Sequence, residues 1–227
     1  MNVELLKRIL SSVIIIPTVL FFAIKGSIYF LFFLIILFFA SSYEWGKLSR
    51  NFSLIRIIGI IILLLSFSSA YFLREKYGLY FFLFIILICI STDVGGYLFG
   101  KIFKGPKLTK ISPKKTYSGV AGSFTIPICI SFFLIENNFN LYSYDNSYLV
   151  ENLYTINLDF NLLTISIILI ISFISQVGDL IVSYFKRQAN VKDTGKILPG
   201  HGGILDRIDG MIFAFPFSYI ILSSNIL

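Results

Sequence analysis

Residues 162–210 read LLTISIILIISFISQVGDLIVSYFKRQANVKDTGKILPGHGGILDRIDG, an apolar run that ends in a dense polar segment. The apolar part, 162–185, is long enough to cross bilayer hydrocarbon as a helix, which takes about 20 residues. The polar part, 183–210, holds three aspartates, five Lys or Arg side chains and the single histidine of the chain. Charges are costly to hold against a membrane, so this cluster is the first candidate for a functional site.

The composition of the whole chain is that of an integral membrane protein. Of its 227 residues, 56% are hydrophobic and 14% are charged, and a soluble domain could not cover so much apolar side chain with polar surface. The segments apolar enough to form membrane helices are 9–24, 27–42, 54–73, 78–99, 120–135, 162–185 and 208–222. Because several of them are short, we expect an all-α, polytopic membrane helix bundle of about seven transmembrane helices, within a range of about six to nine.

The chain shows no internal repeat and no long linker, so we expect one integral membrane domain over residues 1–227. We divide it into N-terminal helices, 1–75, and a catalytic part, about 78–227, with cytoplasmic loops at 100–119 and 186–207. With a cytoplasmic N-terminus and alternating spans, 16 of the 19 Lys and Arg fall on the cytoplasmic side, as the positive-inside rule requires. We therefore expect a bacterial inner (plasma) membrane protein with its active site on the cytoplasmic face.

The net charge of +7 is explained by this topology and by anionic ligands, so we expect no nucleic-acid partner. The loop at 136–161 contains four carboxylates and no Lys or Arg, as an external loop would. An even number of spans would instead bring the C-terminus to the cytoplasmic side.

Acidic side chains stand at the ends of the last two predicted helices. Gln176, Asp179 and Ser183 are spaced by three and four residues, so they share one helical stripe. Asp206 and Asp209 are three residues apart where the chain re-enters the membrane. A carboxylate at that depth needs a cationic partner or a metal, and both remain open. Mg²⁺ suits such oxygen ligands, because it binds one or two carboxylates together with substrate phosphates.

Two loops supply residues typical of phosphate binding. The segment 199–203, PGHGG, surrounds His201 with glycines that let backbone N–H groups approach a phosphate, although a tight turn would also need them. His201 could equally be a loop histidine without a catalytic role. In the other loop, ISPKKT at 111–116 places hydroxyls around two lysines, which suits an oligophosphate. Asp93 is a further carboxylate inside an apolar helix, with a lysine or a metal as its partner.

Several strings in this chain together form the pattern of one enzyme family. They are S-x-F-K-R, K-D-T-G and L-P-G-H-G-G-I-x-D-R-I-D between 183 and 209, with Q-x-G-D-L at 176–180, S-P-K-K-T at 112–116, Gly100-Lys101 after Asp93, and Glu44-Trp45. On these residues the chain resembles the phosphatidate cytidylyltransferases, the CDP-diacylglycerol synthases. The resemblance is strong from about residue 90 to 213 and rests on hydropathy and the Glu-Trp pair before that. One departure is Ser118, where family members usually carry an acidic residue.

The resemblance implies that the chain transfers the CMP moiety of CTP to phosphatidate, giving CDP-diacylglycerol and pyrophosphate. It also implies Mg²⁺ held by Asp179 and Asp206, with Asp209 and Asp93 as further candidate ligands, a potassium ion as a candidate second ion, and a homodimer as a candidate assembly. The implied catalytic residues are Asp179, Asp206, Lys186, Arg187, His201 and Arg207. The implied substrate-binding residues are Ser112, Lys114, Lys115, Thr116, Ser183, Lys192, Asp193, Gly202 and Gly203.

Three other classes share parts of this pattern. A CTP-dependent polyprenol or phytol kinase would also combine a membrane bundle, basic loops and the nucleotide, but it would release CDP in place of pyrophosphate. CDP-alcohol phosphotransferases need Asp-Gly-x-x-Ala-Arg, whereas Asp209-Gly210 is followed by Met211, Ile212 and Phe213. A transporter would spread polar residues toward the bilayer midplane, and here they gather at helix ends and in two loops.

Overall fold

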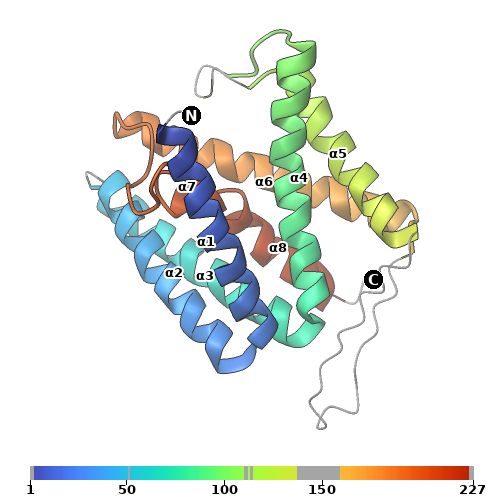
Figure 1. The fold of residues 1–227 in the computed structure, drawn as a ribbon, viewed down its shortest axis with the longest axis horizontal. Helices are drawn as coiled ribbons and strands as arrows, with labels where there is room; N and C mark the ends of the chain where they lie inside the picture. The colour runs from blue at the N-terminus through green and yellow to red at the C-terminus, as the bar shows by residue number, and fades with distance from the viewer. Residues whose placement is uncertain (1–2, 51, 110–111, 113–114, 137–158, 225–227) are drawn as a thin grey trace.

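The computed structural model of this chain describes residues 3–50, 52–109, 112, 115–136 and 159–224 (Figure 1). All regular structure in these ranges is helical, so the prediction of an all-α protein is confirmed. The helices are α1 (Val3–Lys25), α2 (Ser27–Leu48), α3 (Ser53–Tyr77), α4 (Leu79–Phe103), α5 (Tyr117–Glu136), α6 (Leu162–Gln188), α7 (Leu205–Ile208) and α8 (Met211–Ser223).

Six of these helices, α1 to α6, are long and apolar enough to cross a membrane. The seventh apolar segment forms α8, whose 13 residues reach only about 20 Å at 1.5 Å per residue. The prediction of a polytopic helical membrane protein is therefore confirmed, with the seventh helix shorter than a full span. The predicted external loop at 136–161 falls mostly outside the described residues.

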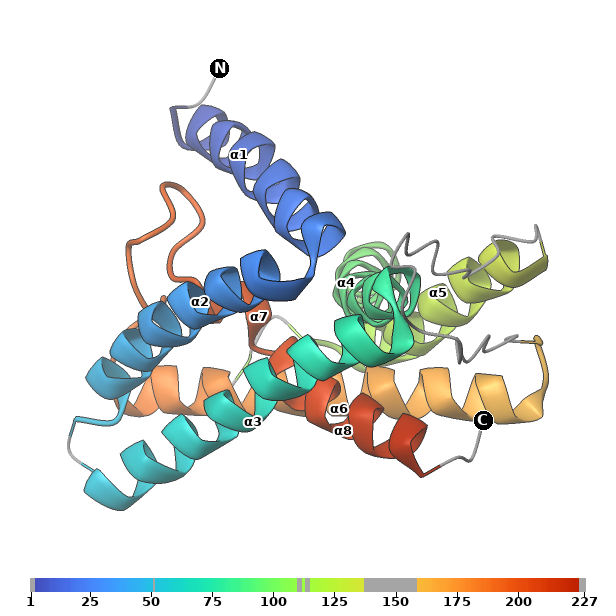
Figure 2. The ribbon, with the colours of Figure 1, turned by 90° about the horizontal axis from the view of Figure 1, so that it is seen from below.

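The helices form two groups that are joined by the last part of the chain. Figures 1 and 2 show α1, α2 and α3 on one side and α4 and α5 on the other, with α6 passing both groups. The short helix α8 packs against α3, α4 and α6. Its Phe215 is buried in a cluster with Phe30 of α2, Leu73 of α3 and Ile85 of α4. Apolar burial at α8 thus joins the two groups into one body.

Glycines allow α4 and α5 to pack very closely. A Cβ atom at Gly95 would lie 2.3 Å from the carbonyl oxygen of Gly122, and one at Gly122 would lie 2.4 Å from the side chain of Phe99. Small residues serve the same purpose at many helix interfaces in membranes, where packing must supply the stability. The contact fixes the end of α4 beside the start of α5, where two parts of the candidate site lie.

Both predicted cytoplasmic loops lie at one end of the bundle. Lys115, just before α5, forms an ion pair with Asp179 of α6 at 2.6 Å. At the same end, Arg8 of α1 donates a hydrogen bond from Nε to the carbonyl oxygen of Gly200 at 3.0 Å. Residues of both loops, among them Thr116 and Asp193, line one cavity. The assignment of this end to the cytoplasm stays a prediction.

Candidate functional site

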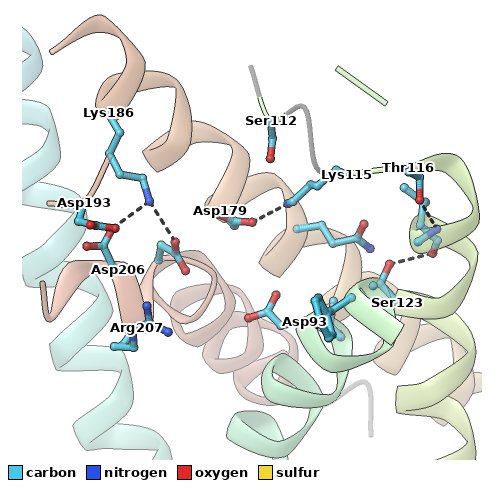
Figure 3. A pocket seen from close by; sticks show the side chains of 17 residues that line it. Asp93, Ser112, Lys115, Thr116, Ser123, Asp179, Lys186, Asp193, Asp206 and Arg207 are labelled. Atoms are coloured by element: carbon cyan, nitrogen blue, oxygen red, sulfur yellow. Dashed lines mark hydrogen bonds and ion pairs between the residues drawn. The ribbon is translucent and has the colours of Figure 1, made fainter. Parts of the chain in front are cut away.

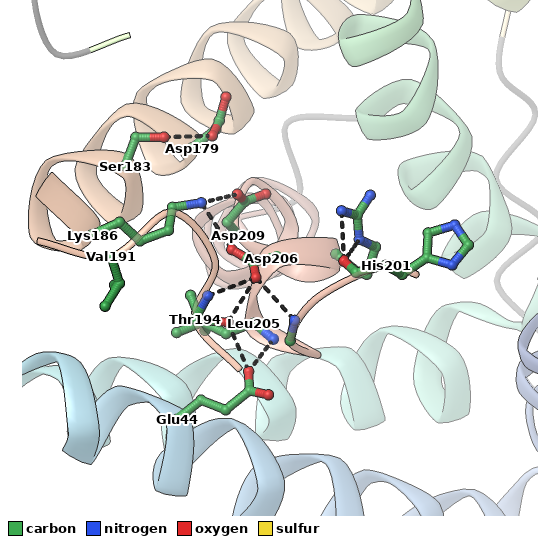
Figure 4. Close-up of polar contacts among 12 residues, drawn as sticks. Glu44, Asp179, Ser183, Lys186, Val191, Thr194, His201, Leu205, Asp206 and Asp209 are labelled. Carbon is green, nitrogen blue, oxygen red and sulfur yellow. Dashed lines mark hydrogen bonds and ion pairs between the residues drawn. The ribbon is translucent and has the colours of Figure 1, made fainter. Parts of the chain in front are cut away.

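Asp206 organises the loop between α6 and α7. Its Oδ2 accepts hydrogen bonds from the backbone N–H of Thr194 at 2.7 Å, the Thr194 hydroxyl at 3.0 Å and the backbone N–H of Gly203 at 3.0 Å (Figure 4). Its Oδ1 accepts from Lys186 Nζ at 2.9 Å, in an ion pair whose side chains are 5% and 11% exposed. Both carboxylate oxygens are therefore already occupied by groups of the protein.

The pKa of Asp206 reflects these contacts. Burial by itself would raise the pKa of this carboxyl group, because it disfavours the charged form. The hydrogen bonds from Lys186, Gly203 and Thr194 outweigh that effect and hold the pKa below its ordinary value. Asp206 is thus a stably ionised carboxylate that ties the two ends of its loop together.

Glu44 of α2 supports the same loop from the opposite side. Its carboxylate accepts hydrogen bonds from the Thr194 hydroxyl at 2.9 Å and from the backbone N–H groups of Ile204 at 3.1 Å and Leu205 at 2.8 Å (Figure 4). The residue is only 1% exposed. A Cβ at Gly203 would lie 2.5 Å from the Glu44 carboxylate, so glycine is required for this close approach. Glu44 therefore caps the first turn of α7 and fixes the loop against α2.

A polar cavity of about 380 Å³ opens between α4, α5, α6 and the loops (Figure 3). Of the residues predicted from the sequence, it brings together Asp93, Ser112, Lys115, Thr116, Asp179, Lys186, Asp193, Asp206, Arg207 and Asp209. The cavity therefore unites carboxylates and cations from five separate stretches of the chain. We call it the polar pocket.

In the polar pocket, lysine side chains lie beside aspartate side chains. Lys115 Nζ lies 2.6 Å from Asp179 Oδ2, and Lys186 Nζ lies between Asp206 at 2.9 Å and Asp209 at 4.0 Å. Asp179 and Asp209 both line the cavity beside these lysines. Asp93 lines the same cavity from α4. Three carboxyl groups gathered in one cavity favour the binding of cations.

The donor set of the pocket fits a magnesium ion that shares its ligands with a substrate. Within the described residues, no group of three or more Asp, Glu, His or Cys side chains is arranged as a complete metal site. Mg²⁺ needs no such cage, because it binds through one or two carboxylates together with water and phosphate oxygens. The oxygens of Asp206 accept four hydrogen bonds from the loop and from Lys186. Asp179 contacts Ser183 and Lys115, and Asp209 contacts Gly210 and, at 4.0 Å, Lys186. Asp179 and Asp209 are therefore the less constrained pair.

His201 points away from the polar pocket and toward α1. Its Nδ1 lies 2.6 Å from the hydroxyl of Ser11, and its Nε2 lies 3.5 Å from that of Ser12. Partial burial, together with the positive charges of Arg207 and Arg8, lowers the pKa of its imidazole. His201 thus connects the PGHGG turn to the first helix, and it is not among the residues that line the pocket.

Other predicted residues support the pocket or lie beside it. The Ser183 hydroxyl donates to Asp179 Oδ1 at 3.2 Å. Gly202 adopts a positive φ of 87° in the turn, which glycine tolerates best. Arg187 and Lys192 are exposed and do not line the pocket. Lys114 lies outside the described residues.

Sequence reasoning did not include several pocket residues in the predicted site. These are Thr92, Gly96, Tyr97, Gly119, Val120, Ser123 and Gln176. Glu44 was noted only as part of a family dipeptide. It has the same property that singled out Asp93, a carboxylate at the end of an apolar helix, so that criterion could have found it.

The fold and the pocket define a polytopic membrane protein with a site suited to phosphate-bearing ligands. Residues 50–225 match the sequence profile of the cytidylyltransferase family. The chain is 36% identical over 219 residues to a phosphatidate cytidylyltransferase of Rickettsia bellii. The matched region covers 94% of this chain and 89% of that protein. This protein therefore belongs to the cytidylyltransferase family, and the predicted resemblance is confirmed.

Two further relatives have the same name. The phosphatidate cytidylyltransferase of Rickettsia conorii is 34% identical over 211 residues, covering 90% of this chain and 85% of the relative. That of Staphylococcus aureus is 39% identical over 150 residues, covering 64% of this chain and 50% of the relative. The similarity to the Rickettsia proteins extends well beyond the motif-bearing part and takes in the N-terminal helices.

Proposed function

We propose that this protein transfers the CMP moiety of CTP to phosphatidate, forming CDP-diacylglycerol and pyrophosphate in phospholipid biosynthesis. The family and the named relatives support this reaction. The observation that carries the proposal to specific residues is the polar pocket, where cations from the loop before α5 and from α6 face carboxylates of α6 and of the segment between α7 and α8. Two polyanionic substrates need such a mixture of charges.

The reaction needs no nucleophilic side chain. An oxygen of the phosphatidate phosphate attacks the α-phosphorus of CTP, a new P–O bond forms, and the bond to the β-phosphate breaks as pyrophosphate leaves. The protein must hold two negatively charged groups together and stabilise charge on the leaving group. Phosphoryl transfer generally depends on positioning and electrostatics of this kind.

We assign the metal-binding role to Asp179 and Asp209, with Asp93 as a supporting carboxylate. When bound, Mg²⁺ would neutralise charge on the triphosphate. This assignment shifts one of the two expected ligands from Asp206 to Asp209, because the oxygens of Asp206 already accept four hydrogen bonds. A second, potassium ion and a homodimer remain predictions of the family resemblance.

The cations have two roles in this proposal. Lys115 and Lys186 neutralise the carboxylates between turnovers and turn toward substrate phosphates when these bind. Arg207 lines the pocket from α7, and Ser112 and Thr116 offer hydroxyls from the other loop. Substrate contacts of Lys114, Ser183, Lys192, Asp193, Gly202 and Gly203, and catalytic roles of Arg187 and His201, stay predictions of the family resemblance. Arg187, Lys192 and His201 do not line the pocket.

We place the reaction on the cytoplasmic face of a bacterial inner membrane, where CTP is available. The distribution of Lys and Arg supports this orientation, since 16 of 19 lie on the same side in the predicted topology. The position of both basic loops around one cavity is consistent with this orientation.

Product analysis tests the proposal. Purified protein would be incubated with Mg²⁺, phosphatidate and CTP labelled at the α-phosphorus. We expect label in a lipid and release of unlabelled pyrophosphate. Labelled CDP with no labelled lipid would indicate a kinase and contradict the proposal, and so would the absence of any CTP turnover by folded protein.

A further inference from the structure

One face of α4 leads from the polar pocket to the end of the helix. Asp93, Tyr97 and Lys101 follow one another at intervals of four residues, so their side chains lie along one stripe, and Lys104 follows directly after the last residue of the helix. Asp93 and Tyr97 line the pocket. Lys101 Nζ lies 3.4 Å from the Tyr97 hydroxyl and 5.5 Å from the centre of its ring. The stripe extends about 12 Å along the axis from Asp93 to Lys101.

The loop after α4 carries a third lysine, Lys107. Lys107 forms an isolated antiparallel bridge with Thr116, a pocket residue. The backbone N–H of Tyr117 donates to the carbonyl oxygen of Pro106 at 3.2 Å, and that of Leu108 donates to Lys115 at 2.8 Å. The loop is thus folded back on the start of α5, at the end of α4 that extends beyond the neighbouring helices in Figure 1.

The charges of these lysines are not balanced by carboxylates of the described part of the chain. Lys101, Lys104 and Lys107 are exposed, and none of them takes part in an ion pair found there. Lys115 and Lys186, by contrast, are both paired inside the pocket. The positive charge outside the pocket is therefore free to attract an anion.

Aromatic side chains accompany the three lysines. Tyr97, Phe103 and Tyr117 are 64%, 65% and 59% exposed. Tyrosine with lysine is the combination found where membrane helices meet the headgroup region. Each lysine close to a membrane surface strengthens attraction to anionic lipid about fivefold. Lysine charge and exposed rings together fit a lipid with a negative headgroup better than a soluble nucleotide.

We propose that Lys101, Lys104 and Lys107, with Tyr97, Phe103 and Tyr117, form an anionic-lipid surface that captures phosphatidate in the bilayer and delivers its phosphate to the polar pocket. The inference rests on the proposed function, because it takes phosphatidate as the substrate. It places the lipid substrate on the α4 side of the pocket. The three lysines then act in the binding of phosphatidate and not in the chemical step.

Kinetics in vesicles test this surface. The variant Lys101→Gln/Lys104→Gln/Lys107→Gln would be reconstituted with phosphatidate diluted in neutral phosphatidylcholine. We expect the KM for phosphatidate, as a mole fraction of lipid, to rise at least about tenfold, with kcat and the KM for CTP unchanged. The matched control is Lys47→Gln/Arg50→Gln/Arg56→Gln, which removes the same charge at the α2–α3 connection. It should leave all three parameters near those of the unchanged protein.

A binding measurement separates this inference from the proposed reaction. Phe103→Trp in a Trp45→Phe background places the only tryptophan on the surface. Brominated phosphatidate should quench its fluorescence more strongly than brominated phosphatidylcholine, and the triple lysine substitution should abolish the difference. Equal quenching by both lipids, an unchanged KM for phosphatidate, or an equal effect of the control variant would overturn the proposed surface. If the unchanged protein bound phosphatidate selectively but made no CDP-diacylglycerol, the reaction alone would be wrong.

Discussion

Glu44 accepts a hydrogen bond from the backbone N–H of Leu205 at 2.8 Å, across 161 residues of sequence. This contact joins the second helix of the chain to the short helix before the last one. It belongs to a set of three bonds to Glu44 that hold the loop carrying Asp206. The position of the predicted catalytic loop therefore depends on a carboxylate that lies outside the catalytic part of the sequence.

Replacement of Glu44 tests that dependence. Glu44→Ala would leave the backbone N–H groups of Ile204 and Leu205 without their acceptor, at a cost of about 1–3 kcal/mol for the buried Leu205 group, while the Thr194 hydroxyl keeps Asp206 as its acceptor. We expect a clear fall in Tm and a loss of turnover. Glu44→Gln retains an amide oxygen and should retain part of both. Equal stability of the alanine variant and the unchanged protein in a thermal unfolding assay would contradict this role.

The two aspartates three residues apart should respond differently to substitution. Asp209→Asn is expected to lower kcat by at least about 100-fold and to raise the Mg²⁺ concentration needed for half-maximal activity. Asp206→Asn is expected chiefly to lower Tm, because it removes the Lys186 ion pair and weakens the loop. The check is a Mg²⁺ titration of activity beside an unfolding curve for each variant. A shifted Mg²⁺ requirement for Asp206→Asn alone would restore Asp206 as the metal ligand.

His201 predicts a dependence of stability on pH. Its pKa in the folded protein is lower than the ordinary value near 6.5, so the unfolded chain takes up a proton at a higher pH than the folded protein does. Stability should therefore fall as pH decreases from about 7 through 6.5 toward the lowered folded value. His201→Gln removes this titration and should flatten the curve of Tm against pH. Parallel curves for the two proteins between about pH 8 and 5 would contradict the assignment.

Close packing of α4 and α5 can be tested by adding one methyl group. In Gly122→Ala the new Cβ would lie 2.4 Å from Phe99 and 2.5 Å from the carbonyl oxygen of Gly95, so the helices must separate. We expect destabilisation of about 1–3 kcal/mol and reduced turnover, because Asp93 and Thr116 would move apart. Gly46→Ala is the matched control, since a Cβ there meets nothing within 4 Å. Similar unfolding of the two variants would show that the contact is not critical.

Hydropathy predicted the helices well, because a run of apolar residues long enough to form a membrane helix can be recognised from local sequence alone. All seven predicted segments are helical, and their ends differ from the structure by several residues. The helix at 211–223 is shorter than predicted at its start, because Leu205–Ile208 forms a separate turn. Local hydropathy cannot detect such a break between two helical stretches.

The sequence predicted which residues gather at the candidate site better than it predicted what each of them does there. The sequence places Asp179 at the end of one predicted helix and Asp206 and Asp209 at the start of the next, and in the structure all three line one pocket. Which carboxylate is free for a ligand depends on the path of the loop, and that path is fixed by Thr194, Gly203 and distant Glu44. The direction of His201 likewise depends on α1, which no local pattern connects to it.

The contacts of Arg8 and Glu44 with residues 194–205 also set an order of assembly. Their partners are synthesised more than a hundred residues later, and between Glu44 and its partners the described residues form the four helices α3 to α6. Until then the carboxylate of Glu44 lacks its hydrogen-bond donors, and the loop between α6 and α7 is not held against α2. The enzyme should therefore become competent only at the end of translation, and a chain arrested before α7 would be inserted but inactive.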